Sequence, residues 1–149
     1  MAYKVERSEE QWRQRLDPPT YSALRERATE FPWSGEFVEN DDQGEYLCKG
    51  CDTALFSSEA KFVAQCGWPA FSRPVKHDIV ECAEDRSQGM IRTEVRCGTC
   101  GSHLGYLFQD GPEDMGGWRY CINSIALWLQ KAADAVDDDA LIKAFLPRG

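Results

Sequence analysis

Four of the seven cysteines in this 149-residue sequence form two closely spaced pairs. The pairs are Cys48-Lys-Gly-Cys51 and Cys97-Gly-Thr-Cys100. Each pair brings two thiols to one tight turn, and four thiolates complete a tetrahedral zinc site that is closed to substrate. Redox dithiols, disulfides and a four-thiolate iron centre are alternatives, but two such pairs in a reducing compartment favour zinc. We therefore predict one structural Zn2+, bound by Cys48, Cys51, Cys97 and Cys100.

Cys121 stands apart from these pairs and has polar neighbours. Arg119 lies two residues before it and Asn123 two residues after it. On a strand, residues two apart project from the same face, so these three side chains are expected to point together. A nearby cation raises the thiolate fraction of a cysteine, and an amide can hydrogen-bond a polarised oxygen. Cys121 is therefore a candidate nucleophile, with a buried structural cysteine as the alternative.

Cys66 and His103 are further candidates for chemistry. Cys66 lies in a segment with glycine and proline, residues 64–71, which predicts a loop, and a loop thiol can approach a second thiol. His103 follows the second cysteine pair and has a side chain that titrates near neutrality, so it is a candidate proton donor. The alternatives are an incidental loop cysteine and an ordinary surface histidine. Cys82 and His77 have no flanking feature that indicates a role.

The composition is that of a globular chain with an acidic balance. Seventeen Lys and Arg residues against 25 Asp and Glu residues give a net charge of -8. Nucleic-acid binding needs cationic side chains that neutralise phosphates, so no nucleic-acid partner is expected. The sequence has neither the apolar segment of a secretory signal nor a run of about 18 apolar residues. We expect a cytoplasmic protein without a membrane partner, with a single domain over residues 1–149 and a core over about 34–129.

Helical signals are confined to the two ends of the sequence. Ser8-Glu-Glu-Gln11 has the pattern of a capping box and opens a short helix that the Asp17-Pro18-Pro19 segment ends. Thr20 is expected to cap a second helix through about Thr29. A final helix over residues 140–146 is expected after the acidic run 137–139, which suits a helix N-terminus.

The candidate residues themselves lie in a region of short strands and turns. Residues 37–38 and 46–47 flank a turn at 40–44, and strand-like windows follow at 90–97, 104–108 and 120–128. Glycine and β-forming residues are frequent throughout this region. The pattern predicts a mainly β fold with antiparallel strands that position both the cysteine pairs and Cys121.

Taken together, these motifs resemble those of the B-type methionine sulfoxide reductases over about residues 8–129. Each enzyme of the methionine sulfoxide reductase class acts on one of the two sulfoxide epimers. The joint order of the motifs is far more specific than any one of them. Besides the two cysteine pairs, they are Cys-Gly-Trp-Pro-Ala-Phe (66–71), Gly-Met-Ile-Arg-Thr-Glu-Val (89–95), Ser-His-Leu-Gly-Tyr-Leu-Phe (102–108), Asp-Gly-Pro (110–112) and Arg-Tyr-Cys-Ile-Asn-Ser (119–124).

The resemblance implies a compact fold in which two antiparallel sheets form a tent-like core beside short helices. It implies that Cys121 attacks the sulfur of methionine-R-sulfoxide and becomes a sulfenic acid, which condenses with Cys66. A thioredoxin-like dithiol is the implied reductant of the Cys66–Cys121 disulfide. Oxidised proteins or peptides are the implied substrates, and we expect the enzyme to be a monomer.

The resemblance also implies the remaining site residues. His103 and Asn123 match polar residues around the substrate oxygen, and Trp68 matches the tryptophan that contacts the substrate methyl group. The predicted substrate-binding residues are Trp68, Phe71, Tyr106 and Arg119. Tyr106 departs from the family pattern, which has a second histidine there. Because a tyrosine has a pKa of about 10, it is a weak acid at neutral pH, and we predict slower turnover than in a two-histidine relative.

Three other functions compete with this interpretation. The first is a zinc-stabilised binding module of the same fold that has lost catalysis, for which Tyr106 would be a sign. The second is a zinc ribbon that contacts nucleic acid, which the acidic charge disfavours. The third is another thiol enzyme that reduces peroxides or nitrosothiols with the same cysteines. The presence of both Cys121 and Cys66 favours catalysis over a binding module.

Overall fold

The computed structural model describes residues 3–132, in which two α-helices precede nine β-strands. The helices are α1 (Glu9–Arg15) and α2 (Pro18–Arg25). The strands are β1 (Gly44–Cys48), β2 (Ala54–Ser57), β3 (Lys61–Phe62), β4 (Ala70–Phe71), β5 (Val80–Asp85), β6 (Arg92–Cys97), β7 (His103–Phe108), β8 (Arg119–Ile122) and β9 (Leu127–Lys131).

Helix α1 begins with the predicted capping box. The Ser8 hydroxyl accepts from the Gln11 backbone N–H at 3.2 Å, and the Gln11 side chain accepts from the Ser8 backbone N–H at 2.9 Å. Both bonds satisfy donors that a helix start leaves unpaired. Trp12 anchors the helix, because its buried ring lies between the guanidinium groups of Arg7 and Arg25.

The predicted boundaries of the second helix are wrong at both ends. Helix α2 begins at Pro18, with Asp17 as its N-cap, and it ends at Arg25 rather than near Thr29. The two prolines that end α1 also open α2, because proline has the φ angle of a helical first turn, where no N–H is needed. Thr20 is a buried residue inside the helix and not its cap.

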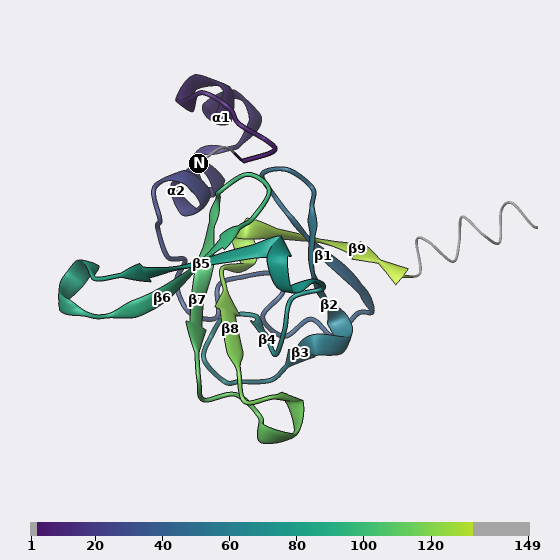
Figure 1. The fold of residues 1–149 in the computed structure, drawn as a ribbon. Helices are drawn as coiled ribbons and strands as arrows, with labels where there is room; N and C mark the ends of the chain where they lie inside the picture. The colour runs from purple at the N-terminus through teal and green to yellow at the C-terminus, as the bar shows by residue number, and fades with distance from the viewer. Residues whose placement is uncertain (1–2, 133–149) are drawn as a thin grey trace, which may run out of the picture.

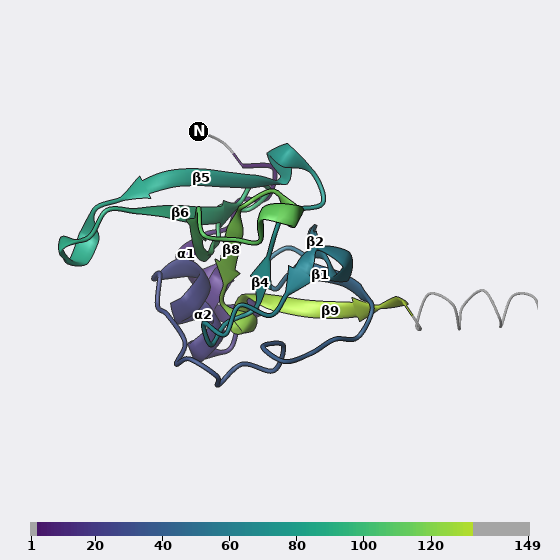
Figure 2. The same cartoon turned by 90° about the horizontal axis from the view of Figure 1, so that it is seen from below.

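The strands form two antiparallel sheets, which confirms the predicted mainly β architecture (Figures 1 and 2). The smaller sheet has the order β2-β1-β9, and the larger has the order β3-β4-β8-β7-β6-β5. Every neighbouring pair is antiparallel. The hairpin of β5 and β6 extends away from the body of the molecule (Figure 1). Helices α1 and α2 lie together beside the sheets (Figures 1 and 2).

Two of the predicted strand windows have a different structure. Residues 37–38 are not in a strand; Phe37 is buried against Tyr46 instead, with its backbone N–H donated to the Ser124 hydroxyl. The window 120–128 divides into β8 and β9 at a 3-10 turn over Ser124–Ala126. This turn carries the chain from the larger sheet to the smaller one, so a single apolar window serves two sheets.

The aromatic core joins the two sheets. Phe71 of β4 stacks on Phe56 of β2 with ring centroids 4.5 Å apart, and it meets Tyr46 of β1 edge-on at 5.1 Å. All three side chains are fully buried. Burial of such large rings is a main contribution to stability, and here it fixes the larger sheet, including β8, against the smaller one.

The final helix predicted for residues 140–146 lies outside the described residues. Within residues 3–132, the two α-helices are too short to cross a membrane.

Candidate active site and metal centre

The four cysteines of the two CxxC pairs meet at one point between the sheets. Cys48 ends β1 of the smaller sheet and Cys97 ends β6 of the larger one, while Cys51 and Cys100 lie in the turns that follow. Their sulfurs all lie within 4.8 Å of one another. The Cys48–Cys100 and Cys51–Cys97 Sγ distances are 3.7 and 3.6 Å. Tetrahedral zinc with Zn–S bonds of about 2.3 Å holds its sulfurs about 3.8 Å apart, so this donor set fits a metal ion.

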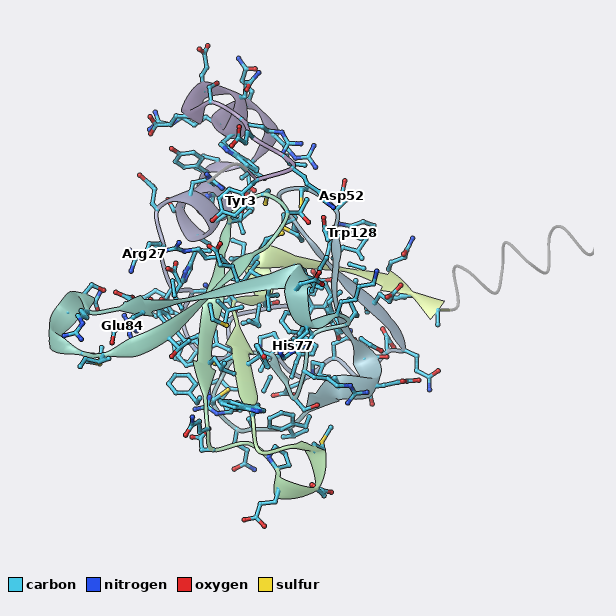
Figure 3. All side chains as sticks on the ribbon, in the orientation of Figure 1. Tyr3, Arg27, Asp52, His77, Glu84 and Trp128 are labelled. Atoms are coloured by element: carbon cyan, nitrogen blue, oxygen red, sulfur yellow. The ribbon has the colours of Figure 1, made fainter. Side chains whose placement is uncertain are left out.

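Hydrogen-bond donors surround the cluster. The Gly50 N–H donates to Cys48 Sγ at 3.3 Å, and the hydroxyls of Thr53 and Ser102 lie 3.0 and 3.1 Å from the sulfurs of Cys51 and Cys100. Such contacts stabilise thiolates. Trp128 of β9 donates to Asp52 at 2.9 Å and ties the first turn to the smaller sheet (Figure 3). These features are those of a closed, structural centre.

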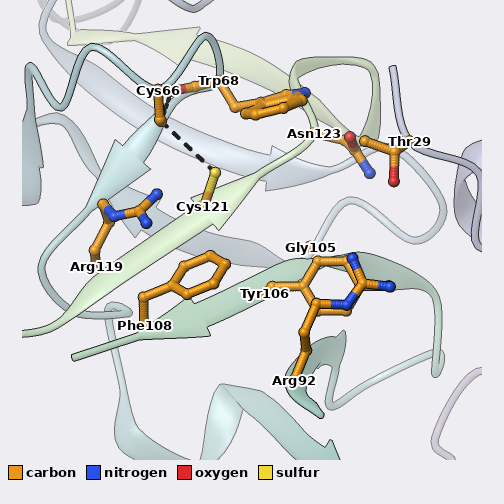
Figure 4. A pocket seen from close by; sticks show the side chains of 10 residues that line it. All are labelled: Thr29, Cys66, Trp68, Arg92, Gly105, Tyr106, Phe108, Arg119, Cys121 and Asn123. Atoms are coloured by element: carbon orange, nitrogen blue, oxygen red, sulfur yellow. Dashed lines mark hydrogen bonds between the residues drawn. The ribbon is translucent and has the colours of Figure 1, made fainter. Parts of the chain in front are cut away.

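Cys66 and Cys121 form a second group of thiols, 3.7 Å apart between their sulfurs (Figure 4). Cys121 lies on β8, paired with Ala70 of β4 on one side and Tyr106 of β7 on the other. Cys66 lies in the loop between β3 and β4, where Gly67 has a φ of 90°. The nucleophile candidate is therefore fixed in a sheet, while its partner is on a loop.

Both thiols line one cavity of about 230 Å³ (Figure 4). The strand alternation predicted for β8 holds, since Arg119, Cys121 and Asn123 all line this cavity. Its other walls are largely aromatic. The complete lining is Thr29, Cys66, Trp68, Arg92, Gly105, Tyr106, Phe108, Arg119, Cys121 and Asn123. An apolar cavity with a few polar groups is typical of a small-molecule site.

Arg119 supplies positive charge beside the two thiols. Asp110 holds its guanidinium through two hydrogen bonds of 2.8 and 3.2 Å, and the group lies over the Phe108 ring. The hydrogen bond from Cys121 lowers the pKa of Cys66 to about 6, and the charge of Arg119 contributes to the same shift. The pKa of Cys121 is raised, first by that shared hydrogen bond and then by burial. The two thiols therefore titrate as a coupled pair and not as independent groups.

Asn123 and Trp68 are held by a segment that the sequence did not single out, residues 27–34. The Asn123 amide accepts from the Glu30 N–H and donates to the Ala28 carbonyl, both at 3.3 Å. The Trp68 indole N–H donates to the Glu30 carbonyl at 3.1 Å. The Asn123 amide keeps one N–H for a ligand. Only long-range contacts define this segment's role, so no local sequence signal reveals it.

His103 and Phe71 do not line the cavity, although the sequence places both in the substrate site. His103 is buried on β7, with its Nδ1 2.6 Å from Glu94 and its Nε2 without a hydrogen-bond partner among the described residues. Burial lowers the pKa of His103, and the bond to Glu94 opposes this shift. Phe71 is part of the aromatic core, which lies behind β4.

Tyr106 lines the cavity, but its hydroxyl is engaged with a buried carboxylate. It donates to Asp85 at 3.0 Å, and the Arg92 guanidinium lies 4.0 Å from the centre of its ring. Asp85 also binds Arg27 at 2.8 Å. The sequence analysis missed Asp85, Arg27 and Arg92, because charged residues in a strand and a connecting loop read as solvated surface.

The comparisons with known proteins agree with this geometry. A family model described as the SelR domain matches residues 16–131. Curated relatives named peptide methionine sulfoxide reductase MsrB cover most of the chain. One from Bradyrhizobium diazoefficiens is 53% identical over 127 residues, 85% of this chain and 91% of its own. One from Chromohalobacter salexigens is 49% identical, over 85% and 96%. One from Leptospira interrogans is 46% identical, over 88% and 99%.

The order of the motifs, the two-sheet fold and the cavity with its thiol pair all agree with these relatives. The family resemblance seen in the sequence is confirmed, and the chain belongs to the SelR-domain family of B-type methionine sulfoxide reductases, oxidoreductases that reduce methionine sulfoxide.

Proposed function

We propose that this protein reduces methionine-R-sulfoxide, preferably in oxidised proteins or peptides, by a mechanism that uses Cys121 and Cys66. The observation that carries the proposal is the approach of these two thiols, 3.7 Å apart, on one aromatic-walled cavity beside Arg119. A thiol pair without a cavity would have no place for substrate. A cavity without the second thiol would have no route back from the oxidised enzyme.

In the first step, the Cys121 proton passes to Cys66 along their shared hydrogen bond, and the Cys121 thiolate attacks the sulfoxide sulfur. The oxygen is protonated and transferred as methionine leaves, so methionine is reduced and Cys121 is oxidised to a sulfenic acid. Arg119 favours the thiolate. Trp68 and Phe108 enclose the methyl group and the side-chain carbons, so that one epimer directs its oxygen to the polar wall.

We propose that His103 supplies the proton and that Asn123 binds the sulfoxide oxygen. Glu94 holds His103 through Nδ1, which leaves Nε2 as the nitrogen available for proton transfer. The ring centroid of His103 lies 5.3 Å from that of Tyr106 in the cavity wall. A small movement of this wall on substrate binding would bring the donor within reach.

In the second step, the Cys66 thiol attacks the sulfenic sulfur of Cys121 and releases water, which leaves a disulfide between them. The sulfurs must approach from 3.7 Å to a bond length of about 2.05 Å, and the loop that carries Cys66 can supply this movement. A thioredoxin-like dithiol then restores both thiols by exchange and is itself oxidised.

We also propose that the CxxC cluster holds one structural Zn2+ per chain, and that residues 1–149 act as one monomeric domain. The donor set of four sulfurs supports the zinc and the single domain, because the cluster ties β1 of the smaller sheet to β6 of the larger one. Zinc would supply folding free energy there and no part of the reaction.

The test is stereo-resolved reduction of blocked methionine sulfoxide in the presence of a dithiol. Wild type should reduce only the R epimer, and Cys121→Ser should lower turnover about 10³-fold or more. Cys82→Ser, a change at the exposed cysteine outside both groups, is the matched control and should keep full turnover. If metal-loaded wild type reduces neither epimer, the chain is instead a binding module of this fold. Faster turnover of peroxide than of sulfoxide would indicate another thiol enzyme.

A further inference from the structure

A second cavity opens beside the sulfoxide cavity. It has a volume of about 260 Å³ and shares Thr29, Arg92 and Tyr106 with the first, so the two are adjacent. We call this second cavity the annex. Its remaining lining is polar or charged and comes from the end of α2 and the turn between β5 and β6: Glu26, Arg27, Ser87 and Gln88. The sulfoxide cavity, by contrast, has largely aromatic walls.

Two guanidinium groups converge on one buried carboxylate at the annex. Arg27 and Arg92 both contact Asp85, at 2.8 and 3.5 Å, so two guanidinium groups share one buried carboxylate. Glu94 lies 3.5 Å from Arg27, but Arg96 already holds that carboxylate at 2.7 Å. Glu26, on the rim, accepts from the Ser22 hydroxyl of its own helix. Arg27 and Arg92 therefore both contact the same carboxylate, Asp85, while the Glu26 carboxylate on the rim makes no ion pair with either of them.

Both arginines are held in place, and Arg92 keeps an N–H donor without a hydrogen-bond partner among the described residues. Arg92 stacks on Tyr106, and this donor is its Nε. Arg27 contacts Asp85 at the end of β5, next to the turn of the β5–β6 hairpin, with close to half of its side chain exposed (Figure 3). Guanidinium groups fixed in this way present planar pairs of N–H donors, which match a carboxylate better than other groups of the same charge.

Resting on the proposed function, we propose that the annex binds a carboxylate of the substrate while the oxidised methionine side chain occupies the sulfoxide cavity. Tyr106 forms a wall of both cavities. When the oxidised side chain fills the sulfoxide cavity, a group attached close to the methionine backbone is therefore the one that reaches Arg27 and Arg92. The carboxylate has two possible sources. It is the α-carboxylate of free methionine sulfoxide, or it is the side chain of an acidic residue beside the oxidised methionine in a protein.

Matched neutral and anionic substrates, all as R epimers, test the proposal. The first pair is N-acetylmethionine sulfoxide as free acid and as methylamide. The second pair consists of two blocked peptides. In one, the methionine sulfoxide has an Asp residue on each side, and in the other Asn replaces both Asp residues. We expect kcat/KM to be about fivefold higher for the anionic member of at least one pair at low salt. The preference should shrink at high salt.

The decisive variant is Arg27→Gln, which should bring the anionic-to-neutral ratio close to one. Because both substrates are compared on the same variant, a general loss of folded enzyme cancels from the ratio. Arg86→Gln is the matched control, since Arg86 lies on the same hairpin and pairs with Glu84 outside the annex. If Arg27→Gln does not fold, Arg27→Lys should lower the ratio in part, and the salt dependence of the wild-type ratio gives a second readout.

The outcomes separate the two sources and the two proposals. A higher kcat/KM for the anionic member of the first pair alone identifies the α-carboxylate as the ligand. A higher kcat/KM for the Asp peptide identifies an acidic neighbour. Equal kcat/KM within both pairs in wild type overturns the annex proposal and leaves the proposed function intact. A preference that Arg27→Gln leaves unchanged also overturns it. Failure of wild type to reduce any neutral R-sulfoxide overturns the proposed function, and the annex proposal with it.

Discussion

The two thiol groups of this molecule have nearly the same spacing and different surroundings. In the CxxC cluster, paired sulfurs lie 3.6 and 3.7 Å apart, and the Cys66–Cys121 sulfurs also lie 3.7 Å apart. Cys48, Cys97 and Cys100 of the cluster are buried, whereas Cys66 and Cys121 line a cavity. Sulfur spacing therefore does not decide function. The number of sulfurs and their access to substrate do.

The chain positions of the thiols add to this difference. Two of the cluster cysteines end strands of different sheets, so movement of one sulfur would disturb the join between the sheets. Cys66 is on a loop and can move without breaking a strand pairing. The cluster receives N–H and hydroxyl contacts, while the thiol pair has beside it the guanidinium of Arg119, which Asp110 holds in place. Four fixed thiolates suit a metal, and one mobile thiol beside one fixed thiol suits disulfide exchange.

Removal of one cluster sulfur should have the largest effect on the fold. Cys48→Ser leaves three sulfurs for the metal, so we expect loss of bound zinc and a fall in Tm of about 10 °C or more. Metal content by elemental analysis and thermal unfolding by circular dichroism measure both. Cys66→Ser should leave both values unchanged. Retained zinc and an unchanged Tm in Cys48→Ser would remove the distinction between the two thiol groups.

Cys66→Ser should separate the two chemical steps of the thiol pair. The variant keeps the Cys121 thiol, so one equivalent of methionine should form in a single turnover. Steady-state turnover with a thioredoxin-like dithiol should fall about 100-fold, because no disulfide forms for it to reduce. Rapid-quench measurement of methionine, with mass spectrometry of the sulfenic acid, tests this. Full steady-state turnover would show that Cys66 is not the resolving thiol.

Arg119→Gln should change the pH dependence of the reaction without loss of metal. Arg119 contributes to the lowering of the pKa of Cys66 to about 6 and lowers the pKa of Cys121 as well. Its removal therefore raises the pKa of the pair, and thiolate forms only at higher pH. We expect the acidic limb of the kcat/KM profile to move up by about one pH unit, so that the rate falls about twofold at pH 7 and about tenfold at pH 5. Arg119→Lys, which keeps the charge, should show a smaller shift. An unmoved limb would contradict this role.

The sequence predicts the elements whose signals are local. The capping box of α1 and the two CxxC turns need only a few neighbouring residues, and the structure has the box and brings the four sulfurs together. The wrong predictions arise where one pattern has two readings. The prolines at 18–19 end one helix and begin the next, and the window 120–128 contains two strands of two sheets.

The residues of the site are harder to predict from the sequence than the elements of the fold. Strand alternation brings Arg119 to the cavity with Cys121, because β8 has a period of two, and Asn123 reaches the same cavity from the position just after the strand. The contacts of residues 27–34 with Asn123 span more than 90 residues of sequence. The contact of Asp85 with Tyr106 also joins separate strands. Such contacts depend on the tertiary packing of the sheets, which no local pattern encodes.

Tyr106→His should have the smallest effect and tests the proton supply of the thiol pair. Burial and the bond to Asp85 raise the pKa of Tyr106, so its hydroxyl stays protonated and is a poor acid at neutral pH. A histidine beside Asp85 would have its own pKa raised by that carboxylate, and it would carry a transferable proton near pH 7. We expect turnover to increase about threefold at pH 7. The gain should disappear as the pH rises through the pKa of the new imidazole.

The matched control for this prediction is Tyr106→Phe. It removes the hydroxyl without adding an acid, so Asp85 loses one hydrogen bond, at a cost of about 1 kcal/mol in stability, and turnover should not increase. A pH profile of kcat for both variants shows whether a gain in turnover comes from the added acid or from the loss of the tyrosine hydroxyl. If Tyr106→His is no faster than wild type, the departure from the family histidine does not limit the rate. The proton then reaches the sulfoxide oxygen from His103 alone, and His103→Gln should lower kcat and remove the basic limb of its pH profile, while the acidic limb set by the thiol pair stays.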